Sequence, residues 1–268
     1  MFMVVAVEDK KEPLRQRLGR LLRGDALEWE ERSCGGNRYR YVVWHGPAER
    51  LPWGRLALLC PRPRSPVLLP PEVLAPEGCP LRDYRPQDFT ARLTVAAARQ
   101  AMEQTAGKGS GLLGLLDPQG IAPWACGEWL DCCRGVKVYP LRRSRYAAAE
   151  TMLRVEYGLP LLWAETPAEL EDCSICAAPY PTGVIRVRRP IITADRSGIQ
   201  GNPTVNRLTL ALTPEQLAEV PPGAEPTAFW GMVTECGTRR VKLPLTLGGC
   251  RIDGRLAEFT ELGKLMRT

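Results

Sequence analysis

Histidine is nearly missing from this sequence, because among 268 residues there is a single one, His45. Catalytic pairs built on serine or cysteine need an imidazole as their base. One histidine at the end of an expected strand leaves no such pair, and a histidine in that position is more often a surface or hydrogen-bonded residue than a catalyst. The sequence therefore predicts no catalytic residue and no metal site around His45.

Long apolar runs are missing as well. No stretch approaches the ~18 apolar residues of a transmembrane helix. The apolar N-terminal segment meets Glu8 and Asp9 without a basic lead or a small-residue cleavage site, so it predicts a first strand and not a signal peptide. We expect no membrane contact.

The ten cysteines lack the spacing of a metal site or of a secreted disulfide framework. Cys173 and Cys176 have the spacing of one zinc pair, but Cys126 stands too far from Cys132 and Cys133 to form the second pair. A thioredoxin-like motif would open a helix, whereas Cys173-x-x-Cys176 runs into a predicted strand. Free cysteines that pack as small hydrophobes are typical of a reducing compartment, which predicts the cytoplasm.

The net charge is +6, with a sequence pI of about 8.8, and the excess is arginine. A mild basic balance is a weak pointer to polyanions. The basic residues are spread out, without the aromatic–basic clusters that stack single-stranded bases, so we consider a nucleic-acid partner unlikely.

The N-terminal part predicts a smaller mixed α/β region. Strands are expected at Phe2–Val7, at 26–32 and at 38–44, the last two joined as a hairpin through Cys34-Gly-Gly-Asn37. Helical patterns cover Lys11–Leu22 and 88–104, and a proline-rich connection, expected to be extended, runs from Cys60 to Arg85.

The stretch from Gly111 to Pro181 alternates short apolar runs with helical patterns. The apolar runs are 111–117, 136–139, 159–163 and 173–178, and the helical patterns are 123–134, 144–157 and 166–170. This β-α-β-α-β-α-β order with short connections predicts a parallel sheet covered by helices.

A strand-rich segment is expected to follow the parallel sheet. Its strands are predicted at 184–187 and 190–193 (one kinked strand or two), at 205–212, near Phe229–Thr234 and at 240–245, with a helix beginning at Thr213-Pro-Glu. Two domains, 1–106 and 107–268, are the first choice, and a boundary at 80–86 is the alternative.

Ligands of open parallel sheets bind at the carboxyl ends of the strands, beside helix N-termini. The expected turn after the first core strand carries Gly114, Asp117 and Gly120, and the loop after the second carries Arg142, Arg143 and Arg145. The order of this turn, this basic loop and the later Ala177-Ala-Pro179 resembles the order of motifs in the NADP-binding domain of shikimate and amino-acid dehydrogenases. The resemblance implies a Rossmann-like parallel sheet with helices on both faces, and arginines that receive the 2′-phosphate of NADP.

The turn departs from the glycine fingerprint of that family. Asp117 and Pro118 stand between the only two candidate glycines; a carboxylate repels a diphosphate, and proline removes a backbone donor. The leading hypothesis is therefore a non-catalytic Rossmann-like protein that binds a protein partner or a small ligand, with no cofactor assured. The alternatives are an NADP-dependent oxidoreductase that uses the arginine loop, and a weak nucleic-acid binder.

Overall fold

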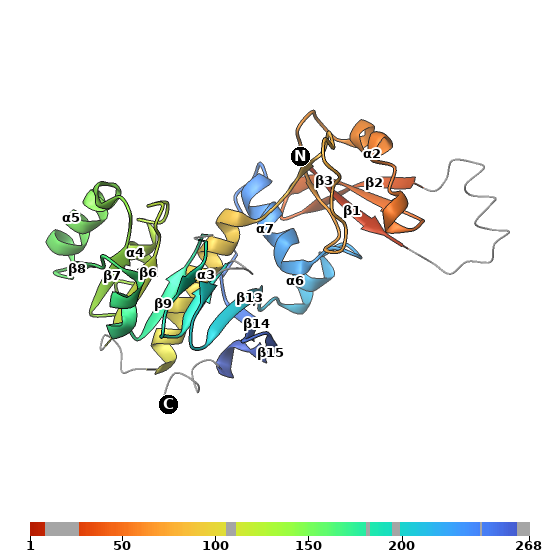
Figure 1. Ribbon diagram of the computed structural model, residues 1–268. Coiled ribbons are helices and arrows are strands. Elements are labelled where there is room, and N and C mark those ends of the chain that lie inside the picture. Colours follow the sequence, from red (N-terminus) through yellow and green to blue (C-terminus); the bar gives the residue numbers. More distant parts are fainter. Residues whose placement is uncertain (9–26, 106–110, 181–182, 195–198, 242, 262–268) are drawn as a thin grey trace. The chain divides into compact units, whose positions relative to one another are not determined.

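The computed structural model describes residues 1–8, 27–105, 111–180, 183–194, 199–241 and 243–261 (Figure 1). The helix expected at Lys11–Leu22 lies outside these residues. Contacts divide the chain into two compact units, Met1–Pro86 with Leu212–Pro244, and Gln87–Ala211 with Leu245–Thr268. The first break falls beside the alternative boundary at 80–86, because the helix that follows it packs on the sheet of the second unit.

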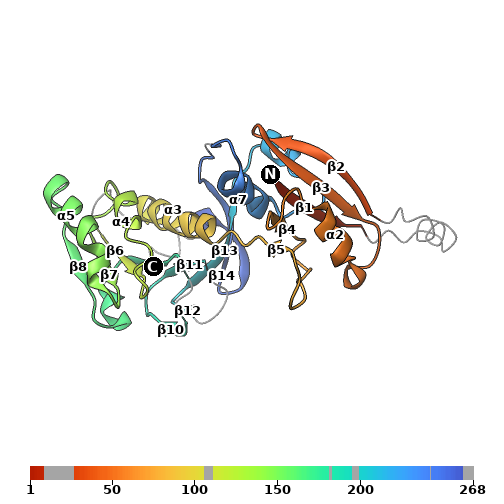
Figure 2. The same cartoon turned by 90° about the horizontal axis from the view of Figure 1, so that it is seen from above.

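The first unit is built on a five-stranded sheet in the order β2-β3-β1-β4-β5 (Figure 2). Its strands are β1 (Phe2–Val7), β2 (Leu27–Cys34), β3 (Asn37–Trp44), β4 (Pro66–Leu68) and β5 (Arg82–Asp83), and its first helices are η1 (Ala48–Arg50) and α2 (Trp53–Leu59). The predicted hairpin is confirmed: β2 pairs antiparallel with β3, and Gly35 and Gly36 take φ of 54° and 75° in the turn. The expected extended connection, in contrast, contributes β4 and β5 to the sheet.

The strand expected near Phe229–Thr234 is a helix, α7 (Pro226–Cys236), which follows the short α6 (Pro214–Ala218). Glu225 caps α7 by accepting hydrogen bonds from Thr227 N at 3.0 Å and Ala228 N at 2.6 Å, with Pro226 at the first position. Phe229, Trp230, Met232 and Val233 are all buried, and a helix buried around most of its surface has the continuous apolar run of a buried strand.

The strand expected at 240–245 is not found among the described residues of that span. The chain just before it bonds to a side chain instead of a strand: Arg239 N donates to Asn37 Oδ1 at 2.7 Å, and Asn37 Nδ2 donates to Arg239 O at 3.0 Å. The backbone of the residue that precedes the expected strand is therefore paired with the Asn37 side chain.

The second unit contains an eight-stranded sheet in the order β15-β14-β13-β11-β9-β6-β7-β8. Its strands are β6 (Leu112–Leu116), β7 (Gly135–Tyr139), β8 (Leu161–Trp163), β9 (Ile175–Ala178), β11 (Ile191–Thr193), β13 (Thr204–Leu210), β14 (Leu247–Ile252) and β15 (Arg255–Glu258). The strands from β13 to β8 are parallel, and β14 and β15 extend the sheet antiparallel. The segment expected as one kinked strand or two forms two, β10 (Ile185–Arg186) and β11, and β10 pairs with β12 (Ile199–Gln200) in a separate ribbon.

Helices pack on this sheet, and Figure 1 shows α3, α4 and α5, of which α4 contacts both α3 and α5. The helices are α3 (Gln87–Thr105), α4 (Ala125–Glu128), η2 (Arg143–Tyr146), α5 (Ala147–Glu156) and η3 (Pro167–Asp172). Long α3 packs on β9, β11 and β13 and contacts α4, while Leu170 of η3 packs with Leu112 and Leu116 of β6. The alternate residues Leu113 and Leu115 of β6 are equally buried, so both faces of the strand are covered. The Rossmann-like α/β fold is confirmed, although α4 is much shorter than the expected 123–134.

Candidate functional site

The turn after β6 is closed by its own carboxylate. Asp117, only 3% exposed, accepts hydrogen bonds from Ile121 N at 3.0 Å and from Ala122 N at 2.7 Å. These amides belong to the connection between β6 and α4, the place where a Rossmann-like sheet presents backbone N–H groups to a phosphate. An anion supplied by the chain itself occupies that position.

Tyr146 completes the shell around this carboxylate. Its hydroxyl donates to Asp117 Oδ2 at 2.6 Å, and its fully buried ring meets Trp163 edge-on with centroids 6.0 Å apart. Burial, the charge of Asp117 and this hydrogen bond raise the pKa of Tyr146 far above that of a free tyrosine. The phenol therefore stays a donor, and the Asp117 carboxylate is held by three hydrogen bonds.

Gly120 brings the arginine loop onto this turn. It takes φ of 65°, and a Cβ built on it would lie 2.9 Å from Arg145 Cδ. Arg145 Nη1 donates to Gly120 O at 3.5 Å, and Leu141 N donates to Pro118 O at 3.1 Å. The turn after β6 and the loop after β7, which the sequence predicted as ligand-binding segments, are therefore in contact. This contact brings Asp117, Gly120 and Arg145 together.

The other two arginines have different surroundings. Arg143 pairs with Glu165 and lies over the Trp163 ring, 5.4 Å from its centroid, so its charge is partly satisfied. Arg142, at the start of η2, is exposed and makes no ion pair with a described residue. Arg142 and Arg145 are therefore the guanidinium groups that this loop offers to a ligand.

Gly114 stands apart from these residues, in the middle of β6. A Cβ there would lie 2.7 Å from Cys176 Sγ and 3.2 Å from Cys173 Sγ. Packing against two thiols accounts for a glycine at this position without any ligand.

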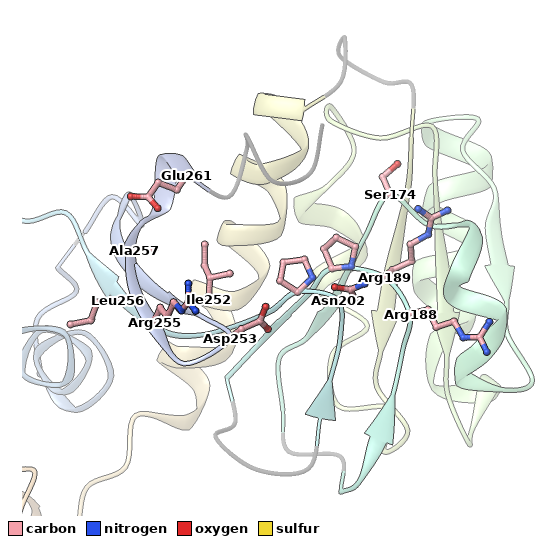
Figure 3. Close-up of a pocket in the computed structure, with 12 residues that line it drawn as sticks. Ser174, Arg188, Arg189, Asn202, Ile252, Asp253, Arg255, Leu256, Ala257 and Glu261 are labelled. Carbon is pink, nitrogen blue, oxygen red and sulfur yellow. The ribbon is translucent and has the colours of Figure 1, made fainter. Parts of the chain in front are cut away.

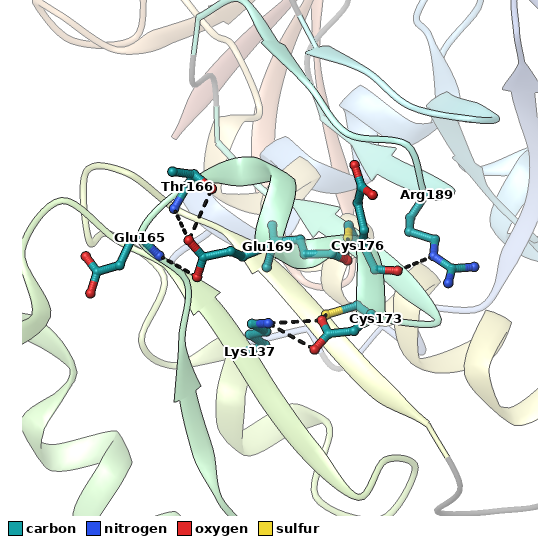
Figure 4. A network of polar contacts seen from close by, with 10 residues as sticks. Lys137, Glu165, Thr166, Glu169, Cys173, Cys176 and Arg189 are labelled. Carbon is teal, nitrogen blue, oxygen red and sulfur yellow. Dashed lines mark hydrogen bonds and ion pairs between the residues drawn. The ribbon is translucent and has the colours of Figure 1, made fainter.

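The two thiols belong to a polar network around η3 (Figure 4). Glu169 caps η3 through Thr166 N and Glu165 N, each at 3.2 Å, and Lys137 pairs with Asp172 at 2.9 Å. The hydrogen bond that the Cys176 thiol shares with Cys173, together with burial, raises the pKa of Cys176, so this thiol stays protonated. All ten cysteines are free, and no cluster of metal-ligating side chains occurs within the described ranges.

His45 lies in the first unit, between two carboxylates. Its Nδ1 is 3.5 Å from Glu8 and its Nε2 is 3.3 Å from Glu28. The side chain is 13% exposed and both ring nitrogens are buried, so His45 does not have the surface position that the sequence suggested.

Half-exposed aromatic groups border the turn, and sequence reasoning did not single them out. Trp124 is 38% exposed, and Tyr180, after β9, donates its hydroxyl to Asp88 Oδ1 at 3.0 Å. Burial and this hydrogen bond raise the pKa of Tyr180 to about 12. Tyr146 was also missed as a partner of Asp117, since no short motif links residues 29 positions apart.

No family model matches the sequence, and no curated protein matches it. Among solved structures, the chain is similar to Δ1-pyrroline-2-carboxylate reductase of Thermococcus litoralis, in complex with NADH and L-proline, at 20% identity and a TM-score of 0.31. It is also similar to iminosuccinate reductase of Paracoccus denitrificans, in complex with NAD+, at 18% identity and a TM-score of 0.31. The first comparison covers 40% of this chain and 36% of the reductase, the second 41% and 38%.

A third similar structure is L-tryptophan dehydrogenase from Nostoc punctiforme, at 12% identity and a TM-score of 0.32, covering 75% of this chain and 64% of that one. The chain spans well under half the length of the first two proteins. At these identities and TM-scores the likeness assigns no activity and no ligand to this chain.

No described helix of the chain combines the length and apolar character needed to cross a bilayer.

Proposed function

We propose that the protein is a Rossmann-like binding protein, which holds a small anionic ligand at the carboxyl edge of its parallel sheet and carries no dinucleotide on the turn after β6. The observation behind this is the Asp117 carboxylate, which receives the amides of Ile121 and Ala122. A diphosphate at these amides would have to displace a buried charge that also holds Tyr146.

The ligand would be gripped by the neighbouring loop. Arg142 and Arg145 are exposed, and the guanidinium fork suits carboxylate and phosphate groups. Trp124 and Ile121, each more than a third exposed, supply apolar surface at the same edge of the sheet. Because every cysteine is free, we expect the protein in the cytoplasm.

A second candidate is an NADP-dependent oxidoreductase. Its specific support is that Arg142 and Arg145 follow β7, where an arginine accommodates the 2′-phosphate in dinucleotide-binding sheets. Two of the similar structures are complexes with NADH and with NAD+. A bound nicotinamide cofactor would require the Asp117 turn to open.

Thermal unfolding with NADPH, NADH and citrate separates the two candidates. The binding proposal expects no shift with either dinucleotide, and a shift with citrate that shrinks in Arg142→Gln/Arg145→Gln. A ligand at 100 times its Kd adds about 2.7 kcal/mol, which moves the midpoint by several degrees. A saturable shift with NADPH alone, lost in Arg142→Glu/Arg143→Glu, would replace the proposal with the second candidate.

A further inference from the structure

A pocket of about 840 Å³ lies in the second unit, beside the amino ends of β9, β11 and β13 (Figure 3). Two of its arginines, Arg189 and Arg255, lie at opposite ends of it, and Arg189 gives its Nε to the Glu171 carbonyl. Among the described residues that line the pocket, no compact group of side chains therefore surrounds one small ligand. The edge strand of the first unit's sheet is a better defined surface.

Strand β2 forms one edge of the five-stranded sheet, and among the described strands it pairs only with β3. Its eight residues run in register with β3 without a bulge, and no proline interrupts them. Edge strands are usually kept from pairing with other chains by shortness, a bulge, a proline or charge. Of these features β2 has only charge, and its charges are of both signs.

The open side of β2 carries the backbone groups of alternate residues. The two-glycine turn closes on the hydrogen-bonded pair Cys34–Asn37, so the even-numbered residues of β2 direct their N–H and C=O groups to β3. The odd-numbered residues, from Leu27 to Ser33, direct theirs to the open side. No described residue outside β3 bonds to the backbone of β2, so these groups are available to another strand.

Exposed side chains of both signs line this edge. Trp29 is 50% exposed, which is high for an indole, and the Arg40 guanidinium lies 4.4 Å from its ring centroid. Glu28, Glu30 and Arg32 project from the other face of the strand, where Arg32 Nε donates to Glu30 Oε1 at 2.6 Å. With an acid near one end and an arginine near the other, β2 is complementary to its own antiparallel copy.

Antiparallel self-pairing centred on Glu30 fits these charges. In this register Glu28 lies opposite Arg32 of the second copy, and the two-fold symmetry forms this pair twice. Four pairs of odd-numbered residues exchange about eight backbone hydrogen bonds, two for each pair. Glu30 lies opposite its own copy, where its bond to Arg32 offsets the repulsion between the two carboxylates.

The two neighbouring registers oppose more like charges. One step toward the start of the strand places Glu28 opposite Glu30 of the second copy, twice by symmetry. One step toward the turn keeps two glutamate–arginine pairs, but it places Glu31 opposite its own copy and Glu28 opposite Cys34. The Cys34 thiol donates to Glu219 Oε2 at 2.9 Å, so this step brings the Glu28 carboxylate beside a second carboxylate.

We propose that the protein forms a symmetric dimer in which β2 pairs antiparallel with β2 of a second copy, centred on Glu30, so that two five-stranded sheets become one. The backbone bonds hold the strands together, and the pairs between Glu28 and Arg32 fix the register. Trp29 then lies opposite Glu31 of the second copy, which removes part of its ring from water. The dimer uses the first unit alone and does not depend on the function proposed for the second.

Sedimentation velocity of the full chain from about 1 µM to about 200 µM tests this, and we expect a monomer–dimer equilibrium with a Kd in the micromolar range. Arg32→Glu should weaken the dimer about tenfold or more, because it turns two attractive pairs into repulsive ones. Glu28→Arg/Arg32→Glu should recover most of that loss, since it restores the pairs with their signs exchanged. Arg50→Glu, at an exposed residue of η1, is the control and should leave the Kd unchanged.

Cysteine cross-linking tests the register separately. Directly opposite residues that do not hydrogen-bond each other have Cβ atoms close enough for a disulfide, so Glu30→Cys should link two copies on mild oxidation. Glu28→Cys is the control, because this register places it four residues away from its own copy. It should link no more than the unmodified protein, whose free cysteines set the background.

Three results would overturn the proposal. They are a monomer at every concentration, a dimer that Arg32→Glu weakens no more than Arg50→Glu does, and stronger cross-linking of Glu31→Cys than of Glu30→Cys. The first would leave the edge of β2 to a partner other than a second copy. Circular dichroism verifies that the variants are folded, and the cross-linking result stands independently of Arg32→Glu.

Discussion

Replacing Asp117 by alanine should destabilise the second unit more than any exposed acidic substitution. The change leaves the buried Ala122 amide and the buried Tyr146 hydroxyl without their acceptor, while Ile121 lies where water can reach it. An orphaned buried donor costs about 1–3 kcal/mol, so two cost about 2–6 kcal/mol. At about 2–4 °C per kcal/mol, the thermal midpoint should fall by about 10 °C.

Circular dichroism during thermal and urea unfolding measures this loss. Asp117→Asn keeps one acceptor oxygen and should lose about 1–2 kcal/mol. Asp131→Asn is the matched control, because its side chain is 84% exposed and its carboxylate lies 3.8 Å from the Arg99 guanidinium. A double-mutant cycle with Tyr146→Phe should return a coupling of about 1 kcal/mol or more. If Asp117→Ala stays within about 0.5 kcal/mol of the control, the carboxylate does not hold the turn.

Other parts of the structure give further predictions. Gly114→Ala should cost about 1–3 kcal/mol in urea unfolding, because its Cβ meets Cys176 Sγ, and Cys176→Ala should recover part of it; equal losses in both backgrounds would exclude the thiol contact. Gly120→Ala and the control Gly158→Ala share φ near 65° and should each cost about 1 kcal/mol, but only the first displaces Arg145 and should weaken citrate binding. Burial raises the pKa of Tyr39 from 10.0 to about 12, so its contribution to stability is complete below pH 10 and falls as pH rises toward 12. In an absorbance titration, the tyrosinate signal that appears near pH 12 should fall by the share of one tyrosine in Tyr39→Phe, because Tyr180 still ionises there; loss of signal near pH 10 instead would contradict the raised pKa of Tyr39.

The order of the core strands could be predicted because each strand of a covered parallel sheet is a short apolar run bounded by turn residues. Leu112–Leu116 and Ile175–Ala178 are buried on both faces, and their sequences show it. The same property gave a wrong prediction at Phe229–Val233, because a helix that is buried on most sides has the same continuous apolar run as a buried strand.

The candidate site was only partly predictable. That Asp117 conflicts with a diphosphate follows from its charge, and that Arg142 and Arg145 follow a strand is visible in the chain order. The Asp117 carboxylate also accepts a hydrogen bond from Tyr146, which is buried and comes from another loop. No local sequence pattern identifies a hydrogen-bond partner so far along the chain. The pocket before β9, β11 and β13 is also assembled from distant segments.

Equilibrium titration of the unmodified protein with NADPH, followed by nicotinamide fluorescence, tests the central claim most directly. With the Asp117 carboxylate on the amides of Ile121 and Ala122, we predict no saturable binding up to about 1 mM. Saturable binding with a Kd in the micromolar range, weakened by Arg142→Gln/Arg145→Gln, would contradict the account and identify the turn after β6 as a working dinucleotide site.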